Sequence, residues 1–227
     1  MNTRLLLLET SGEICSVCIS YGNAVVSLQE STESFSHASE VTILIQKAMK
    51  MADWEMKDLD AVVVSDGPGS YTGLRVGLSV AKGLCFGLDI PLIAVNSLAA
   101  LADFAQAEYP DALYFPMIDA RRMEVYMRGY DADRQSIFPI GAVILAENTF
   151  DEWLPCGKKI VLCGSGVEKS KTLYKASQNF VFIETTFSSK HLIHLGLKSF
   201  QQKEFVDFAS HTPFYLKPPN ITQPKKK

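Results

Sequence analysis

The segment Gly67-Pro68-Gly69-Ser70-Tyr71-Thr72-Gly73-Leu74-Arg75 joins a continuous apolar run, residues 59–65, to a helix-forming stretch that ends at Leu88. An apolar run of this length is typical of a strand buried on both faces of a sheet. A buried strand, a glycine-rich turn and a helix together are characteristic of α/β folds. The segment therefore predicts an α/β architecture, with a helix over residues 74–88.

The glycine-rich turn matches no standard phosphate loop. A Walker A loop needs lysine after its last glycine, and here Leu74 follows Gly73. The Rossmann fingerprint needs a third glycine where Thr72 stands. Backbone N–H groups at the start of the following helix could still face an anion. Glycines with positive φ in a tight turn explain the composition as well, and the local chemistry favours this turn over a phosphate cradle.

The helix behind this turn carries small and apolar residues on one broad face. They are Gly73, Val76, Gly77, Val80, Ala81, Gly83, Leu84 and Gly87. Glycine inside a helix costs about 1 kcal/mol relative to alanine, so this face indicates another backbone at close range. The opposite face offers only Arg75, Ser79 and Lys82 as polar groups, which indicates a helix covered on more than one side. Either the chain covers both sides itself, or one side binds another protein.

Hydrophobic periodicity and turn residues place the remaining elements. They predict strands at residues 4–9, 14–20, 24–28, 91–95, 112–118, 123–130 and 160–163. They also predict helices at residues 36–50, 97–104 and 191–202, the first two capped by Ser36 and Ser97. The first three strands form an antiparallel meander, because hairpin turn residues separate them.

A polar stretch at residues 103–111 places a boundary between two lobes. The first lobe, residues 1–106, contains the glycine-rich turn, and the second, residues 107–227, is smaller and ends in a tail. We expect the tail to be disordered beyond Pro219 and its earlier part to pack back on the first lobe. Its lysines, Lys217 and Lys225 to Lys227, either contact RNA phosphates or stay solvated.

The composition limits the classes of function. Hydrophobic residues make up 47% of the chain and charged residues 21%, as in folded globular proteins. The net charge of −3 excludes a broad basic face for nucleic acid, because phosphate binding needs clustered cations. No apolar run reaches the roughly 18 residues of a membrane helix. We therefore expect a cytoplasmic protein without membrane contact that engages nucleic acid only through a partner.

Several residues have chemistry that could form a site. Glu9 and Asp66 end strands of the first lobe and could hold a metal ion, although carboxylates at strand ends are more often caps or solvated groups. Cys15 and Cys18 are three residues apart on a strand, so their thiols point to opposite faces and cannot share a metal. His191 and His194 lack a third ligand nearby, which favours exposed or capping histidines.

Three motifs indicate a family. They are Leu7-Leu8-Glu9-Thr10-Ser11-Gly12 with Cys15-Ser16-Val17, the turn with its helix from Gly67 to Gly77, and the run from Met117 to Tyr126. Together they resemble the TsaB (YeaZ) family, whose members are partners of TsaD, the threonylcarbamoyl transferase subunit in tRNA threonylcarbamoyladenosine biosynthesis. The resemblance covers nearly the whole chain, and it is most specific at the turn and its helix.

The resemblance implies an α/β fold of the actin-like ASKHA (ribonuclease H-like) class, two-lobed, with mixed sheets flanked by helices and a reduced second lobe. It implies a non-catalytic subunit that binds and activates a TsaD homologue, joined by a TsaE-like ATPase in a larger assembly. A homodimer is expected when the chain is alone, and tRNA is engaged indirectly. ATP or ADP and a metal are expected on the partner subunits, with no cofactor or metal bound tightly here and no catalytic residue.

The resemblance also assigns residues to two sites. The partner interface takes the small-residue face together with Thr72, Arg75, His37, Glu40, Val41 and Leu44. A nucleotide in the cleft between the lobes would meet Glu9, Asp66, Gly67, Gly69, Gly164 and Gly166. The helix of TsaD carries two histidines four residues apart as metal ligands, whereas here Val41 follows His37. Many members carry aspartate where Glu9 stands.

Three other functions stay open beside this one. The first is an ATP-binding phosphotransferase or ATPase of the actin-like fold, which would use the cleft residues. The second is a glycoprotease-like peptidase, against which the missing second histidine counts. The third is a homodimeric structural protein that ignores TsaD.

Overall fold

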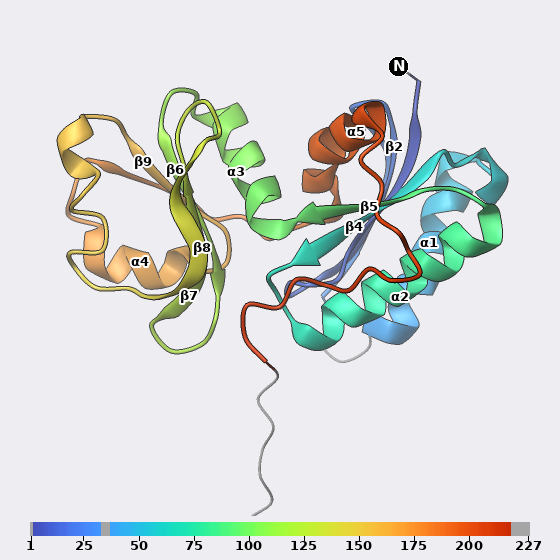
Figure 1. The fold of residues 1–227 in the computed structure, drawn as a ribbon, viewed down its shortest axis with the longest axis horizontal. Helices are drawn as coiled ribbons and strands as arrows, with labels where there is room; N and C mark the ends of the chain where they lie inside the picture. Colours follow the sequence, from blue (N-terminus) through green and yellow to red (C-terminus); the bar gives the residue numbers. More distant parts are fainter. Residues whose placement is uncertain (1, 33–36, 219–227) are drawn as a thin grey trace, which may run out of the picture.

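Two five-stranded sheets form the two lobes of the computed structural model, which describes residues 2–32 and 37–218 (Figure 1). The first sheet has the strand order β3-β2-β1-β4-β5. Its strands are β1 (Arg4–Glu9), β2 (Cys15–Tyr21), β3 (Ala24–Ser31), β4 (Ala61–Gly67) and β5 (Leu92–Asn96). β1, β2 and β3 pair antiparallel, which confirms the meander, and β4 joins β1 and β5 in parallel.

Helices cover both faces of this first sheet. α1 (His37–Ala52) and α2 (Tyr71–Leu88) pack on one face, where the side chains of Leu6 and Leu8 point. α3 (Ser97–Glu108) and α5 (Ile193–Gln202) pack on the other face, against Leu5 and Leu7. The alternation of four consecutive leucines between two cores is the period of a strand buried on both sides.

The second sheet has the order β10-β9-β6-β7-β8. Its strands are β6 (Leu113–Asp119), β7 (Glu124–Tyr130), β8 (Ser136–Ile144), β9 (Ile160–Cys163) and β10 (Phe180–Ile183). α4 (Val167–Tyr174) contributes to the aromatic core of this lobe, and α3 lies between the two lobes (Figure 1). Short 3₁₀ helices lie at Met56–Asp58, Leu154–Cys156 and Ser189–Leu192 (η3). The predicted boundary between residues 106 and 107 falls inside α3.

The tail returns to the first lobe after α5. Val206 forms a bridge with Leu92 at the edge of β5, and the backbone N–H of Phe214 donates to the carbonyl of Asp66 at 2.8 Å. Figure 1 shows this segment running along α2. Lys225 to Lys227 and the predicted disorder beyond Pro219 lie outside the described residues, as do Ser36 and the side chain of His37. No helix in the described ranges is long and apolar enough to cross a membrane.

The start of α3 differs from the prediction. Asn96, not Ser97, is the N-cap, and its side-chain oxygen accepts from the N–H groups of Leu98 and Ala99 at 3.1 Å each. Ser97 is the first helical residue, and its buried hydroxyl has no partner among the described residues. Ser97 was a reasonable candidate because serine and asparagine cap helices about equally well.

This cap gives a matched pair of substitutions. Asn96→Ala is expected to lower the free energy of unfolding by about 1 kcal/mol or more, because two N–H groups lose their acceptor and the carbonyl of Gly67 loses its donor, Asn96 Nδ2. Ser97→Ala removes an unpaired hydroxyl and is expected to change that free energy by less than about 0.5 kcal/mol. Urea unfolding of the two variants checks the assignment, and a larger loss for Ser97→Ala would contradict it.

Candidate functional site

The inner part of the small-residue face of α2 packs against the chain itself. A Cβ on Gly73 would lie 1.9 Å from the carbonyl oxygen of Thr10, and one on Gly77 would lie 2.3 Å from the Thr10 hydroxyl oxygen. That hydroxyl donates to the carbonyl of Gly73 at 2.7 Å, and Ala81 is completely buried. The close backbone that the glycines indicate is therefore that of Thr10, directly after β1. Gly73, Gly77 and Ala81, which the resemblance assigns to the partner interface, pack against the chain itself in this structure.

Two residues assigned to the interface on α1 are buried as well. Val41 and Leu44 are 0% and 6% exposed and pack in the core between α1 and the sheet. Their i, i+3 spacing is that of a helix face turned toward its own sheet. Glu40, at the start of α1, is half-buried. The amphipathic pattern thus marks the inward face of α1, and a partner would meet the opposite face.

The outward part of the helix pair remains open. A Cβ added to Gly83 or Gly87 would have no atom within 4 Å in the described part of the chain. Val76, Val80 and Leu84 are half-buried beside them, Thr72 is exposed, and Ile43 on α1 is 48% exposed. We call Ile43, Val76, Val80, Gly83, Leu84 and Gly87 the outer helix surface. Ile43 was missed from the sequence, although it lies opposite the buried positions of α1.

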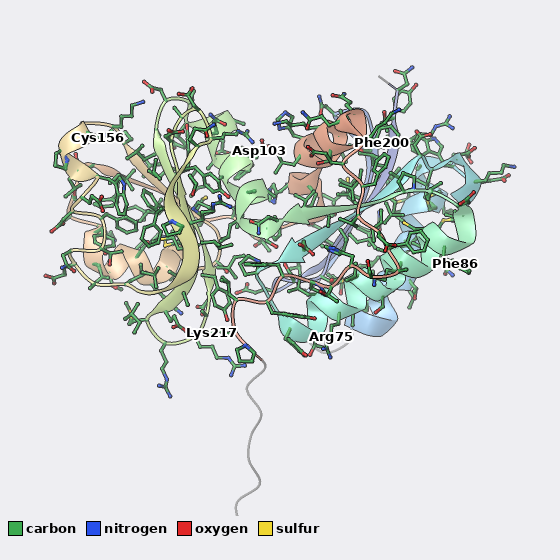
Figure 2. All side chains as sticks on the ribbon, viewed as in Figure 1. Arg75, Phe86, Asp103, Cys156, Phe200 and Lys217 are labelled. Carbon is green, nitrogen blue, oxygen red and sulfur yellow. The ribbon has the colours of Figure 1, made fainter. Side chains whose placement is uncertain are left out.

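The tail covers the other side of α2. The guanidinium of Arg75 stacks on Tyr71, 4.2 Å from the ring centroid, and its Nε donates to the Tyr215 hydroxyl at 3.1 Å. Lys82 donates to the carbonyl of His211 at 2.7 Å. Figure 2 shows Arg75 and Phe86 at opposite ends of α2, and the ring of Phe86, which is 78% exposed, lies 6.4 Å from that of Phe208. The tail therefore runs along the Arg75–Lys82 side of α2 through these contacts, although Arg75 and Phe86 stay exposed.

The Glu9 side chain accepts hydrogen bonds from residues of the turn between β1 and β2. Its Oε1 accepts from the N–H of Ser11 at 2.5 Å, the hydroxyl of Ser11 at 2.6 Å and the N–H of Gly12 at 3.0 Å. Its Oε2 is buried without a hydrogen-bond partner in the described ranges, and so is the hydroxyl of Ser65 beside it. Burial raises the pKa of Glu9 to about 7, and the hydrogen bonds from Ser11 and Gly12 offset only part of that rise.

Asp66 takes part in a different contact. Its Oδ1 pairs with Nε2 of His211 in the tail at 2.8 Å. Burial raises the pKa of the Asp66 carboxyl, and the hydrogen bond and charge of His211 oppose the rise. Glu9 and Asp66 therefore share no contact and form no acid–base pair. The tail, which the sequence does not connect with Asp66, binds the carboxylate instead.

Cavities lie between the lobes where a nucleotide would bind. One of about 240 Å³ is lined by Gly12, Ser165 and Gly164, and a neighbouring polar groove of about 720 Å³ reaches Gly69. Gly67 and Gly166 do not line them, because Gly67 packs on the carbonyl of Phe214 and Gly166 on Met117.

The tail also contacts the second lobe. Both carboxylate oxygens of Glu124 on β7 accept from Lys217 of the tail at 2.6 Å, and Lys217 is labelled at the bottom of Figure 2.

These residues do not fit a metal-bound nucleotide. A phosphate in the first-lobe turn would need the N–H groups of Ser11 and Gly12, and both already donate to Glu9. A second anion there would meet the Glu9 carboxylate at close range. No group of three or more His, Cys, Asp or Glu residues in the described ranges could hold a metal ion. We therefore derive no catalytic step through a nucleotide in this chain.

The cysteine and histidine pairs have structural surroundings. Cys15 lies in the core under α1 and Cys18 in the core under α5, so the two thiols occupy opposite faces of β2. His191 caps η3 by accepting from the N–H of Ser188 at 3.1 Å, as one of the two interpretations predicts. His194 pairs with Asp103 at 2.7 Å. The strand period correctly predicted that the two thiols point to opposite faces. For the histidines, the interpretation as capping residues fits His191.

Comparison with known proteins places the chain in a family. Residues 31–224 match the family model described as TsaD, tRNA N6-adenosine threonylcarbamoyltransferase. The chain belongs to the TsaD family. The Haemophilus influenzae tRNA threonylcarbamoyladenosine biosynthesis protein TsaB is 35% identical over 125 residues, which are 55% of this chain and 52% of the relative. This chain thus spans about half the length of that relative. The resemblance to TsaB within the TsaD family is confirmed.

Solved structures confirm the fold of this TsaD family member. A Pseudomonas aeruginosa protein described as similar to the peptidase YeaZ superposes with a TM-score of 0.80 at 25% identity, covering 95% of this chain and 100% of that chain. Component A of the (R)-2-hydroxyglutaryl-CoA dehydratase of Acidaminococcus fermentans superposes with a TM-score of 0.54 at 8% identity, covering 89% of this chain and 99% of that chain. The α/β fold predicted from the sequence, and the actin-like class that the resemblance implies, are therefore correct.

Proposed function

We propose that this chain is a non-catalytic subunit that binds a TsaD homologue and enables threonylcarbamoyl transfer to the adenosine beside the anticodon in tRNA. The observation that carries the proposal is the outer helix surface. Gly83 and Gly87 leave space beside α2, since a Cβ added at either would meet no described atom within 4 Å. Half-buried Val76, Val80 and Leu84 lie on the same helix next to them. An apolar surface with room for a second backbone fits a helix of a partner better than it fits solvent.

The chemistry of the chain supports a role without catalysis. The carboxylate of Glu9 bonds to the turn beneath it and is fully buried, so it has no access to a substrate. Burial raises the pKa of the Cys15 and Cys18 thiols to about 12, which keeps them protonated and poorly nucleophilic near neutral pH. These two observations count against the ATPase and the peptidase alternatives, respectively.

The proposed assembly follows from the same surface. The TsaD homologue binds the outer helix surface as a heterodimer, and a second copy of this chain binds it when TsaD is absent. A TsaE-like ATPase joins the heterodimer, and ATP or ADP and the metal are bound by the partner subunits. The net charge of −3 supports indirect engagement of tRNA, through surfaces that the partners supply.

Gly83→Arg tests the position of the interface. The arginine side chain enters open space in the isolated chain, so the variant is expected to fold as the wild type does. In the complex the arginine would occupy the space beside α2 that the partner needs. The affinity for the TsaD homologue is expected to fall by about tenfold or more, since a charged group would be buried without a partner. Isothermal titration with the TsaD homologue of the same organism measures the change.

The matched control is Gly141→Arg on β8, which also faces open space but belongs to the second lobe. It is expected to leave the affinity within about twofold of the wild type. An unchanged affinity for Gly83→Arg, or an equal loss for Gly141→Arg, would place the interface elsewhere.

A further inference from the structure

A separate cavity of about 560 Å³ lies on the side of the first sheet away from α1 and α2. Its walls come from α3, η3 and α5, with the turns after β2 and β7 at its edge. Small-molecule sites usually have a volume of about 300–1,000 Å³ and form where two lobes meet. The proposed function makes no use of this cavity, because the outer helix surface is on the other face of the sheet.

The body of the cavity is apolar. Phe104 of α3, Ile193 of α5 and Val25 of β3 contribute to its lining, and Val25 is 48% exposed. The ring of Phe104 lies 4.6 Å from that of His191, measured between centroids. Burial lowers the pKa of His191 to about 4, so this imidazole is neutral and acts as a flat, mostly apolar wall.

A buried carboxylate organises the polar side of the cavity. Asp103 is only 8% exposed, and its Oδ1 contacts both the guanidinium of Arg134 and Nδ1 of His194. Arg134 also donates to the side-chain oxygen of Gln106 through Nε. These contacts fix the position of Arg134, which comes from the turn after β7 and adopts a left-handed φ of 61°. Figure 2 shows Asp103 between the lobes, at the opposite edge from Lys217.

The charges at the cavity do not balance. Lys190 of η3 lines it and forms no ion pair with any described residue. Asp103 is the one carboxylate that lines the cavity in the described ranges, facing two permanent cations, Arg134 and Lys190. Nδ1 of His191 accepts from Ser188, so its Nε2 carries the proton and supplies a neutral donor. Among the residues that line the cavity, one positive charge and one N–H group are therefore left for a ligand.

We propose that this cavity binds a small molecule that carries an anionic group, a carboxylate or a phosphate, on an apolar body of ring size. The anionic group pairs with Lys190 at the rim, the cation that no described carboxylate neutralises. The apolar body lies against Phe104 and Ile193. The Asp103–Arg134 pair by itself would only tie the lobes together, and it leaves the unpaired Lys190 and the apolar hollow unexplained.

A pair of fluorescent probes tests both halves of the proposal. 1-Anilinonaphthalene-8-sulfonate is an aromatic anion, and N-phenyl-1-naphthylamine is the same body without the charge. We expect the anion to bind the full chain with a Kd that rises tenfold or more in Lys190→Glu. The neutral probe is expected to change by less than twofold, because it does not use Lys190.

Two controls separate this cavity from other surfaces. Lys198→Glu makes the same charge change on α5 outside the cavity and is expected to leave binding of the anion within twofold. Phe86→Ser removes the exposed ring on α2 and is also expected to have no effect. A Kd that is unchanged in Lys190→Glu, or that rises equally in Lys198→Glu, would overturn the proposal.

Displacement of the bound probe identifies the anionic group. Phenyl phosphate displacing the probe at tenfold lower concentration than benzoate would assign the group as a phosphate, and the reverse would assign a carboxylate. If neither compound displaces the probe at millimolar concentration, the cavity is not a site for such anions. Binding of the TsaD homologue is expected to be the same for Lys190→Glu and the wild type, so the failure of either proposal leaves the other standing.

Discussion

Gly73→Ala is expected to lower the free energy of unfolding by about 3 kcal/mol or more, whereas Gly83→Ala raises it by up to about 1 kcal/mol. The two substitutions add the same methyl group to the same helix. At Gly73 the methyl carbon would lie 1.9 Å from the backbone oxygen of Thr10, just after β1, and backbone cannot move aside as a long side chain can. At Gly83 no described atom lies within 4 Å.

Urea unfolding of both variants, followed by far-UV circular dichroism, measures the difference. Because the propensity gain of alanine over glycine is common to both positions, the difference between them isolates the contact with Thr10. If both variants gain stability, α2 does not approach β1 as closely as described. If both lose stability, the surface around Gly83 is not open in the isolated chain.

The second prediction concerns Glu9 and pH. Its pKa of about 7 in the folded chain lies above its ordinary value of 4.5, so folding favours the protonated carboxyl. The resulting contribution to stability is complete below about pH 4.5 and is lost as the pH rises through 7. A shift of this size corresponds to roughly 3 kcal/mol. Glu9→Gln keeps an acceptor for Ser11 and Gly12, adds a donor toward Ser65 and has no charge to lose.

The measurement is the difference in unfolding free energy between Glu9→Gln and the wild type, at pH values from 5 to 8. His191 alone would make stability rise with pH, because its folded pKa of about 4 lies below its ordinary 6.5. Its contribution is the same in both proteins and cancels in the difference. We expect the unfolding free energy of Glu9→Gln to increase relative to that of the wild type as the pH rises. A difference that does not change with pH would show that the carboxylate is well solvated or better bonded than described.

The sequence was most informative where the chain has one structural solution. Four leucines in β1 and three valines in β4 are typical of strands buried on both faces, and both segments were correctly predicted to be buried strands. β8 was missed because it contains Pro139 and Gly141, which disfavour a central strand, and it lies at the edge of its sheet. α4 and β10 have only 8 and 4 residues, too few for a clear period.

The site was harder to predict than the fold. The glycines of α2 correctly indicated a close backbone, but periodicity cannot tell whether that backbone belongs to the chain or to a partner. Gly73 and Gly83 are both glycines of α2, and only the tertiary structure shows that Gly73 is closely packed whereas Gly83 is open. The pairing of Asp66 with His211 joins positions 145 residues apart, and no local pattern marks such a contact.

The central claim is that this chain activates a TsaD homologue without catalysing the transfer itself. Its most direct test is threonylcarbamoyl transfer to tRNA, measured with the TsaD homologue and TsaE-like ATPase of the same organism, with and without this chain. We predict transfer only when this chain is present, loss of transfer with Gly83→Arg, and no ATP hydrolysis by the chain alone. Full transfer without the chain, or ATP hydrolysis by the isolated chain, would contradict the account.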